Sequence, residues 1–472
     1  MDLFDLLKDI LPPQLSISLT ITFTVYIALK AFQKYRSNWL TAIDLETIFL
    51  TRIMIIVFLL LYPALQNYAS LKTSSKLLLE LVISYRWALI FYLAFEAGLY
   101  LLRYYIRRKT VLPAGYVQAC YSAIIQCQDS DGGGIKVKNE IHAPVQLWTT
   151  AQSLYGLIKT INDVQLIPHI RKIIHYYERA LVEEPTIWST SKSPNIVVSG
   201  WALISMIEFY STKSYREIFE SEAVNIHKWI VDGLNSIVLL QLHNGGWATM
   251  GNEEADLRIF PTSVSVWALS IAVRDRESLN LNQEQVADLY KAILQGVNNL
   301  KISYNKELGV WDSNPNRNWV QKNNALTLLT YGILMKVEQI VVKYGNSYES
   351  QKLLNELTPW LNSQYEQIMG HVDHCLGRDI NDNEADAPFD DLMSTPEGSK
   401  APVTYYDWIY CAYLALRASR LSKRSTIRDA VREKQIIDVL VKHREWLPNW
   451  YTYKTALILI ASSIDEKSPY QL

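Results

Sequence analysis

A turn that carries a tryptophan recurs along the C-terminal three quarters of this chain. The clearest copy is QLHNGGWATM, residues 241–250, where two glycines follow an apolar helical run. QDSDGGG at 128–134 repeats the glutamine, three spacers and two glycines, and YNKELGVWD at 304–312 is a looser copy. Glycine pairs favour turns, whereas tryptophan normally packs against a partner. The repetition predicts one supersecondary unit stacked several times, with Gly246 in a left-handed or crowded turn position.

Each turn leads into a segment that is apolar nearly all round. Six such segments begin near residues 143, 193, 260, 319, 401 and 449, and the segments before them are polar on one face. A helix that is apolar all round is buried, whereas a one-sided helix covers a core. The sequence therefore predicts an all-α fold in which residues 111–472 form an α/α toroid of about six helical hairpins. An open solenoid of helical hairpins is the alternative.

Residues 1–110 have a different composition and predict a transmembrane helical domain. Segments 10–29, 48–71 and 77–102 are each long and apolar enough to span a bilayer. The first contains LSISLTITFTVY, which alternates like a strand, but a lone strand cannot satisfy its backbone in lipid. We therefore expect three membrane helices.

Lysines and arginines near these segments predict the orientation of a multi-pass membrane protein. They cluster after the first segment and in RYYIRRK at 103–109, whereas the N-terminus is acidic. This bias places the toroid in the cytoplasm. Arg86 lies inside the third segment and should pair with Glu80, Glu96, a lipid phosphate or a partner subunit, so a homo-oligomer or a partner protein is expected. A net charge of −1 gives no basic face for nucleic acid.

The turn and the segment after it resemble repeats of the terpenoid cyclase and protein prenyltransferase superfamily. The resemblance rests on Gln-x-x-x-Gly-Gly-Trp followed by PTSVSVWAL at 261–269, and it covers roughly residues 113–462. It implies that the glutamine and the tryptophan tie the loop to neighbouring helices. It also implies a central cavity that binds an isoprenoid or lipid ligand, with the membrane helices anchored in the bilayer. The D-x-D-D motif of class II cyclases is missing, and DAPFDD at 386–391 is the closest string.

Aromatic and polar residues near the predicted inner-helix starts are the candidates for lining this cavity. Asp407 is the candidate catalytic acid, because the tyrosines around it would desolvate its carboxyl group and raise its pKa. An aspartate that only stabilises a helix start is the alternative. The candidate cavity residues are Trp148, Trp201, Arg258, Trp267, Asn323, Asn324, Tyr405, Tyr406, Tyr410 and Lys454.

One short stretch, HVDHC, supplies residue types that bind zinc. Asp373 and Cys375 match the D-x-C of protein prenyltransferases, and His371 and His374 lie beside them. The resemblance requires a further histidine where this chain has Trp450 and Tyr451, so solvated histidines at a helix end are the alternative. Zinc is the candidate metal cofactor, and no nucleotide motif is present. A calcium loop is the weaker alternative, because Asp379, Asn381, Asn383 and Asp390 match part of an EF-hand but Glu384 stands where that loop needs glycine. The acidic insertion 376–402 is expected to form a mobile acidic flap over the cavity mouth.

Two functions remain open at this stage. The first is a membrane-anchored toroid that binds an isoprenoid or lipid ligand, with its transformation left undecided. The second is a toroid without catalysis that serves as a sensor or as a partner-docking module coupled to a membrane effector. Fold alone does not decide between them.

Overall fold

The computed structural model describes the toroid part of the chain in eight segments. They are residues 112–160, 164–183, 195–249, 257–312, 324–376, 408–422, 424–442 and 452–462, with Arg444 and Leu447 in addition. The three segments expected to cross a membrane lie outside the described residues, as does nearly all of the acidic insertion.

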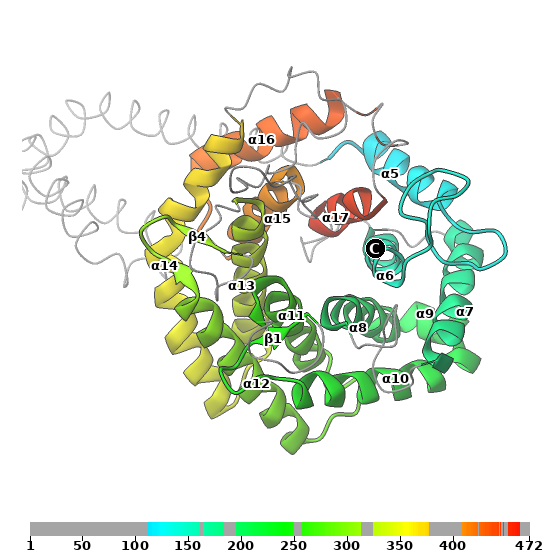
Figure 1. Cartoon of the computed structure of the whole chain (residues 1–472), viewed down its shortest axis with the longest axis horizontal. Coiled ribbons are helices and arrows are strands. Elements are labelled where there is room, and N and C mark those ends of the chain that lie inside the picture. The colour runs from blue at the N-terminus through cyan, green and yellow to red at the C-terminus, as the bar shows by residue number, and fades with distance from the viewer. Residues whose placement is uncertain are drawn as a thin grey trace, which may run out of the picture. The chain divides into compact units, whose positions relative to one another are not determined.

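Twelve of the described helices form two concentric rings (Figure 1). The outer ring contains α5 (Ala114–Gln126), α7 (Ile167–Glu183), α10 (Glu220–Leu239), α12 (Gln283–Ile302), α14 (Tyr348–Leu376) and α16 (Ile427–Lys442). The inner ring contains α6 (Leu147–Thr160), α8 (Ile196–Ser211), α11 (Ile259–Arg274), α13 (Asn324–Tyr344), α15 (Trp408–Leu421) and α17 (Thr452–Ser462).

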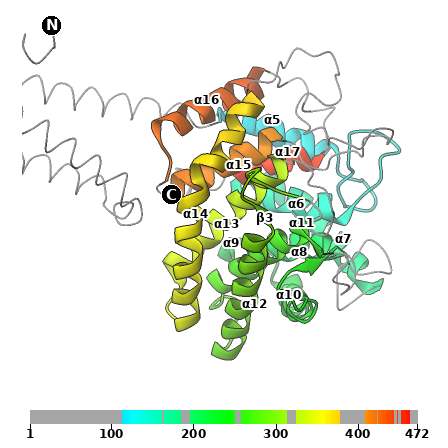
Figure 2. The same cartoon turned by 60° about the vertical axis from the view of Figure 1, so that its left-hand side comes forward.

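The inner ring is closed. Each inner helix packs against the next one along the chain, and the last, α17, packs against the first, α6. Among the outer helices, α12 contacts α10 and α14, and α14 contacts α16; Figure 2 shows α12 beside α14. The predicted α/α toroid is therefore confirmed, and the open solenoid is wrong because its ends would not meet.

The inner helices are buried on every side, as their composition predicts. In α8 and α11 nearly every side chain is buried, since each faces two inner neighbours, an outer helix and the axis. Among the described helices, α13 alone is long and apolar enough over Ala325–Tyr344 to cross a membrane, yet most of that segment is buried within the ring.

Three glycines bring inner helices close together. A Cβ atom on Gly332 of α13 would lie 3.2 Å from the Cα atom of Ala415 in α15. A Cβ atom on Gly156 of α6 would meet the Ala456 carbonyl oxygen of α17 at 3.2 Å, and one on Gly200 of α8 would meet α11. Around the inner ring, every second contact between neighbouring helices therefore has a glycine in its interface.

The glutamine of the recurring turn ties its own loop to the next outer helix. Gln241 Nε2 donates to the carbonyl oxygens of Gly245 at 2.8 Å and Ala292 at 2.9 Å. Gln128 Nε2 makes the same pair of bonds, to Gly133 at 3.0 Å and His169 at 2.9 Å. The predicted role of the glutamine is confirmed in both copies.

The tryptophan of the turn is buried, and its ring lies against the preceding outer helix. Trp247 Nε1 donates to the Ile237 carbonyl at 2.8 Å, and Trp311 Nε1 donates to that of Leu300 at 2.7 Å. The two residues belong to short hairpins that pair β1 (Trp247–Ala248) with β2 (Leu257–Arg258), and β3 (Tyr304–Asn305) with β4 (Val310–Trp311). The structural role expected for Trp247 is confirmed.

The left-handed position of the turn belongs to Gly245. Its φ is +85°, and Gly133 and Gly309 have φ values of +76° and +70° at the equivalent places. A Cβ atom on Gly245 would lie 2.5 Å from the carbonyl oxygen of Gln295. The assignment of the left-handed position to Gly246 is therefore wrong by one residue.

Candidate functional site

The starts of the inner helices are held together at one end of the ring, here called the mouth. The backbone N–H of Thr452, in the first turn of α17, donates to the Val137 carbonyl in the loop before α6 at 2.8 Å. The N–H of Ile196, which begins α8, donates to the Thr249 carbonyl in the hairpin before α11 at 3.0 Å. The connecting loops thus bind the start of an inner helix other than the one they lead into.

A threonine in the first turns links each hairpin to the helix that follows. Thr262 Oγ1 accepts from the N–H of Trp247 at 3.0 Å and donates to the Arg258 carbonyl at 2.8 Å. Thr327 and Thr150 accept in the same way from the residues that lead into α13 and α6. These bonds fix the starts of three of the six inner helices.

Aromatic rings fill the axis below the mouth. Trp267 of α11 meets Trp201 of α8 at 5.4 Å between ring centroids and Tyr155 of α6 at 6.0 Å. Since α8 lies between α6 and α11 in the ring, Tyr155 and Trp267 meet across the inside of it. Nearer the helix starts, Trp148 of α6 lies 5.0 Å from Tyr453 of α17.

Exposure falls from the first turns towards these rings. Trp148, Val197 and Phe260, in the first turns of α6, α8 and α11, are each half-buried. One turn further along the same helix faces lie Gln152 and Trp201, with exposed fractions of 1% and 0%. Solvent therefore reaches the first-turn side chains but stops at the second turn.

Several buried polar atoms at this depth have no hydrogen-bond partner. The most informative are Gln152 Oε1 and Trp201 Nε1, one acceptor and one donor. Burying such a group without a partner costs about 1–3 kcal/mol, so native proteins satisfy nearly all of them with protein, water or ligand. Three hydroxyl groups on α6 and α11 share this state, those of Thr149, Ser153 and Ser265.

The opposite end of the inner helices is closed by buried ion pairs. Arg274 of α11 lies 2.8 Å from Glu208 of α8, and Arg417 of α15 lies 3.2 Å from Glu433 of α16. Burial lowers the pKa of Arg274, but Glu208 and Asp275 outweigh it and raise that pKa well above its usual value. These ion pairs therefore have a structural role, because they hold the ends of neighbouring helices together.

Five of the residues expected to line a cavity lie in inner helices or directly before one. Trp201 and Trp267 contact each other, and Trp148 lies in the first turn of α6. Arg258 directly precedes α11, and Lys454 lies in the first turn of α17. Tyr410 is buried in α15. Asn323, Tyr405, Tyr406 and Asp407 lie outside the described residues, and Asn324 begins α13 without a described side chain.

Two of the four candidate zinc ligands have structural partners. His371 Nε2 bonds the Gly309 carbonyl oxygen at 2.7 Å. This bond holds the third copy of the recurring turn, at 304–312. Asp373 accepts from Arg432 at 2.6 and 2.7 Å and also pairs with Arg428. The hydrogen bond from Arg432 is the main reason that the pKa of Asp373 is lowered. The side chains of His374 and Cys375 lie outside the described part, within which no group of three His, Cys, Asp or Glu residues could hold a metal.

The sequence did not single out Gln152, Thr149, Ser153 or Ser265. A signal was present in TTAQS at 149–153, where four polar residues interrupt an otherwise apolar helix. Polar residues inside a fully buried helix need partners, and here several have none.

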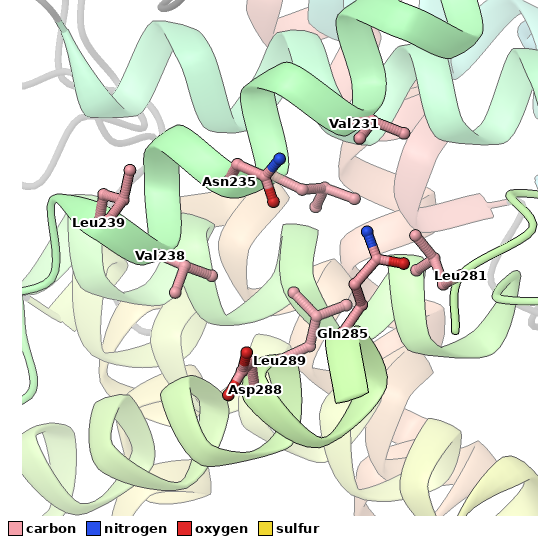
Figure 3. Close-up of a pocket in the computed structure, with 9 residues that line it drawn as sticks. Val231, Asn235, Val238, Leu239, Leu281, Gln285, Asp288 and Leu289 are labelled. Carbon is pink, nitrogen blue, oxygen red and sulfur yellow. The ribbon is translucent and has the colours of Figure 1, made fainter. Parts of the chain in front are cut away.

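A separate groove lies on the outer ring between α10 and α12 (Figure 3). Its volume is about 400 Å³, and its walls are mainly aliphatic. The residues that line it are Val231, Leu234, Asn235, Val238, Leu239, Leu281, Gln285, Asp288 and Leu289.

No family model and no curated protein matches this chain. Solved structures with a similar arrangement include a cellobiose 2-epimerase from Bacillus thermoamylovorans, 10% identical, covering 68% of this chain and 84% of its own, with a TM-score of 0.45. A possible GH105 family member from Salmonella enterica is 14% identical, with coverage of 74% and 92% and a TM-score of 0.45. An unsaturated glucuronyl hydrolase specific for heparin is 9% identical, with coverage of 74% and 96% and a TM-score of 0.44.

The expectation of an isoprenoid or lipid ligand is wrong. None of the three solved structures named above is described as a terpenoid cyclase or a prenyltransferase. The mouth gives the physical reason, because its second turn presents amide, indole and hydroxyl atoms without partners. A hydrocarbon chain would leave them unpaired at a cost of about 1–3 kcal/mol each. These findings give no better support to the alternative prediction, a toroid without catalysis that serves as a sensor or a partner-docking module.

Proposed function

We propose that the toroid binds a hydroxylated small molecule of the saccharide class at its mouth. One observation carries the proposal: unpaired donors and acceptors lie one helical turn below an aromatic pair, of which Trp148 is half-buried and Tyr453 is buried. Gln152 Oε1 and Trp201 Nε1 are the clearest of these atoms, and Trp148 with Tyr453 forms the aromatic surface.

A saccharide matches both halves of this arrangement. One face of a pyranose ring presents C–H groups, which pack against an aromatic ring, while its hydroxyl groups both donate and accept hydrogen bonds. Because solvent stops at the second turn in this structure, binding requires the first-turn side chains to move aside. A hydroxyl group can then donate to Gln152 Oε1, and another can accept from Trp201 Nε1. Small-molecule sites commonly combine apolar walls with a few convergent polar groups of this kind.

The proposal is tested by titrating monosaccharides and disaccharides into the full-length chain in detergent and measuring heat. Replacing Gln152 with leucine keeps the size but removes the acceptor, so affinity should fall about tenfold or more. Gln285→Leu, in the groove between α10 and α12, is the matched control and should bind as wild type does. Equal loss in both variants, or no heat from any saccharide, would overturn the proposal.

We also propose that residues 1–110 anchor this toroid in a membrane, with the toroid in the cytoplasm. The support is the length and apolar character of segments 10–29, 48–71 and 77–102 and the bias of positive charges around them. A thiol reagent that cannot cross membranes should label Cys375 only after cells are opened. The three other cysteines, Cys120, Cys127 and Cys411, are buried thiols and supply little background. Labelling of Cys375 in intact cells would contradict this orientation.

A further inference from the structure

The second helical turns of the inner helices fill the ring with buried side chains. In α6, α8, α11, α13, α15 and α17, every residue of the second turn that the structure describes is buried. The first turns differ, because Trp148, Val197 and Phe260 are half-buried there. Within the described part of the ring, a ligand can therefore enter from the mouth but cannot pass along the axis.

Two aromatic rings of the third helical turns form a floor beneath the unpaired polar atoms. Tyr155 of α6 and Trp267 of α11 meet across the inside of the ring at 6.0 Å between centroids, and their exposed fractions are 4% and 0%. At ~1.5 Å per residue, α6 rises about 10 Å from Trp148 at the mouth to Tyr155 at the floor. The candidate site is therefore short and closed at its inner end.

The floor is held by a buried ion pair. The Tyr155 hydroxyl group donates to the Glu208 carboxylate, which lies 2.8 Å from Arg274. Moving Tyr155 would disturb a charge pair that is shielded from water, and an unpaired buried charge is strongly unfavourable. The first-turn side chains border solvent instead. Binding therefore displaces first-turn side chains such as Trp148 and leaves the floor in place.

A site of this shape distinguishes the end of a saccharide chain from its middle. A sugar unit that bonds Gln152 Oε1 and Trp201 Nε1 lies one helical turn below the mouth, with buried side chains around and beneath it. An internal unit of a linear chain is linked to a neighbour on each side, so both arms of the chain would have to return through the mouth. A terminal unit has one neighbour, and a single arm leads out.

We infer that the mouth recognises the end of a saccharide chain and binds its terminal unit; this inference rests on the function proposed above. The terminal unit bonds Gln152 Oε1 and Trp201 Nε1, and the rest of the chain extends into solvent past Trp148. Tyr155 and Trp267 set the depth to which the chain enters.

The inference is tested with saccharides that share a repeating unit but differ in the number of ends per unit. Glucose, mannose, xylose and galacturonate are each titrated, as monosaccharide, linear trisaccharide and linear polysaccharide, into the full-length chain in detergent. For a sugar that binds, we expect the dissociation constants of the trisaccharide and the polysaccharide, expressed per chain, to agree within about threefold. The heat should also saturate with no more than one protein per chain end.

Two variants locate the binding that is measured. Gln152→Leu should weaken the trisaccharide and the polysaccharide by the same factor, about tenfold or more, because both present one terminal unit to the same atom. Gln285→Leu, in the groove between α10 and α12, is the control and should bind both as wild type does. Thermal unfolding of the two variants shows that each is folded.

The failures of the two proposals look different. A dissociation constant per chain that falls in proportion to chain length, or several proteins bound along one chain, would overturn end recognition and leave the saccharide site intact. Binding confined to free monosaccharides would do the same. No heat from any of the sugars, or binding that Gln152→Leu leaves unchanged, would overturn the saccharide site and end recognition together.

Discussion

The backbone N–H of Trp247 donates to the hydroxyl oxygen of Thr262 at 3.0 Å, and so joins the hairpin before α11 to the first turn of that helix. The same bond joins Trp311 to Thr327 at 3.0 Å before α13. The turn that recurs in the sequence is thus the device that positions the start of an inner helix. Since those starts form the mouth, damage to a turn should disturb the candidate site as well as stability.

Truncation of the buried tryptophan tests this positioning role. Trp247→Ala should lower the free energy of unfolding by about 3–5 kcal/mol, because it removes a fully buried ring and the bond to Ile237. Denaturant unfolding of the full-length chain measures the change. Trp148→Ala, which truncates a half-buried ring at the mouth, should cost distinctly less. Equal costs would contradict the account.

Gly245 makes a second test, of the turn's backbone. Gly245→Ala should destabilise the chain by more than about 1 kcal/mol, since the residue has φ +85° and its Cβ would lie 2.5 Å from the Gln295 carbonyl oxygen. Gly370→Ala is the control, because it lies within α14 and a Cβ there meets nothing within 4 Å. That variant should be neutral or more stable by up to about 1 kcal/mol. Thermal unfolding that ranks the two variants the other way would refute the assignment.

The fold could be predicted because two sequence signals agree. The spacing of the turns defines the repeat, and the all-round apolar segments identify the inner helices. The turn's chemistry was predicted to within one residue. Asn244 bonds the N–H of Gly246 at 3.0 Å, and this local bond places the left-handed residue at Gly245, which the glycine pair alone does not specify.

The candidate site was harder to predict. Trp148 and Trp201 could be placed near helix starts from their position in the repeat. The polar atoms of Gln152 and Ser153 matter because they are buried without partners, a property of packing across α6, α8 and α17 that one helix's sequence does not reveal. The expectation of an isoprenoid ligand rested on a resemblance in the turns, which position the helix starts but do not supply the side chains of the second turn.

The lowered pKa of Asp373 predicts that the stability of the fold depends on pH. Its pKa is lowered, first by the hydrogen bond from Arg432 and then by the charges of Arg432 and Arg428, so the carboxylate stabilises the folded state. This contribution is complete above the unfolded-state pKa of about 3.9 and is lost as pH falls through the lower folded-state value. Asp373→Asn should therefore be less stable than wild type at pH 5 in urea unfolding. The difference should shrink as pH falls below about 4.

The outcome that would contradict this role is a difference independent of pH between wild type and Asp373→Asn. Glu356→Gln is the control. The Glu356 side chain is half exposed where it pairs with Lys301, so the pair should contribute little to the free energy of unfolding.

Asp407 separates a structural role from a catalytic one. It directly precedes α15, which begins at Trp408. An aspartate before a helix stabilises its start, and asparagine caps as well but lacks the charge. Asp407→Asn should therefore lower the free energy of unfolding by about 0.5 kcal/mol and leave saccharide affinity unchanged. Unchanged affinity together with loss of a product that wild type forms from the bound sugar would instead make Asp407 the acid catalyst.

The central claim is that a saccharide binds at the mouth, and a structure of the full-length chain with bound sugar tests it most directly. The account predicts density for the sugar against Trp148, with hydroxyl oxygens within hydrogen-bond distance of Gln152 Oε1 and Trp201 Nε1. Sugar density in the groove between α10 and α12, with the mouth occupied by water alone, would contradict the account.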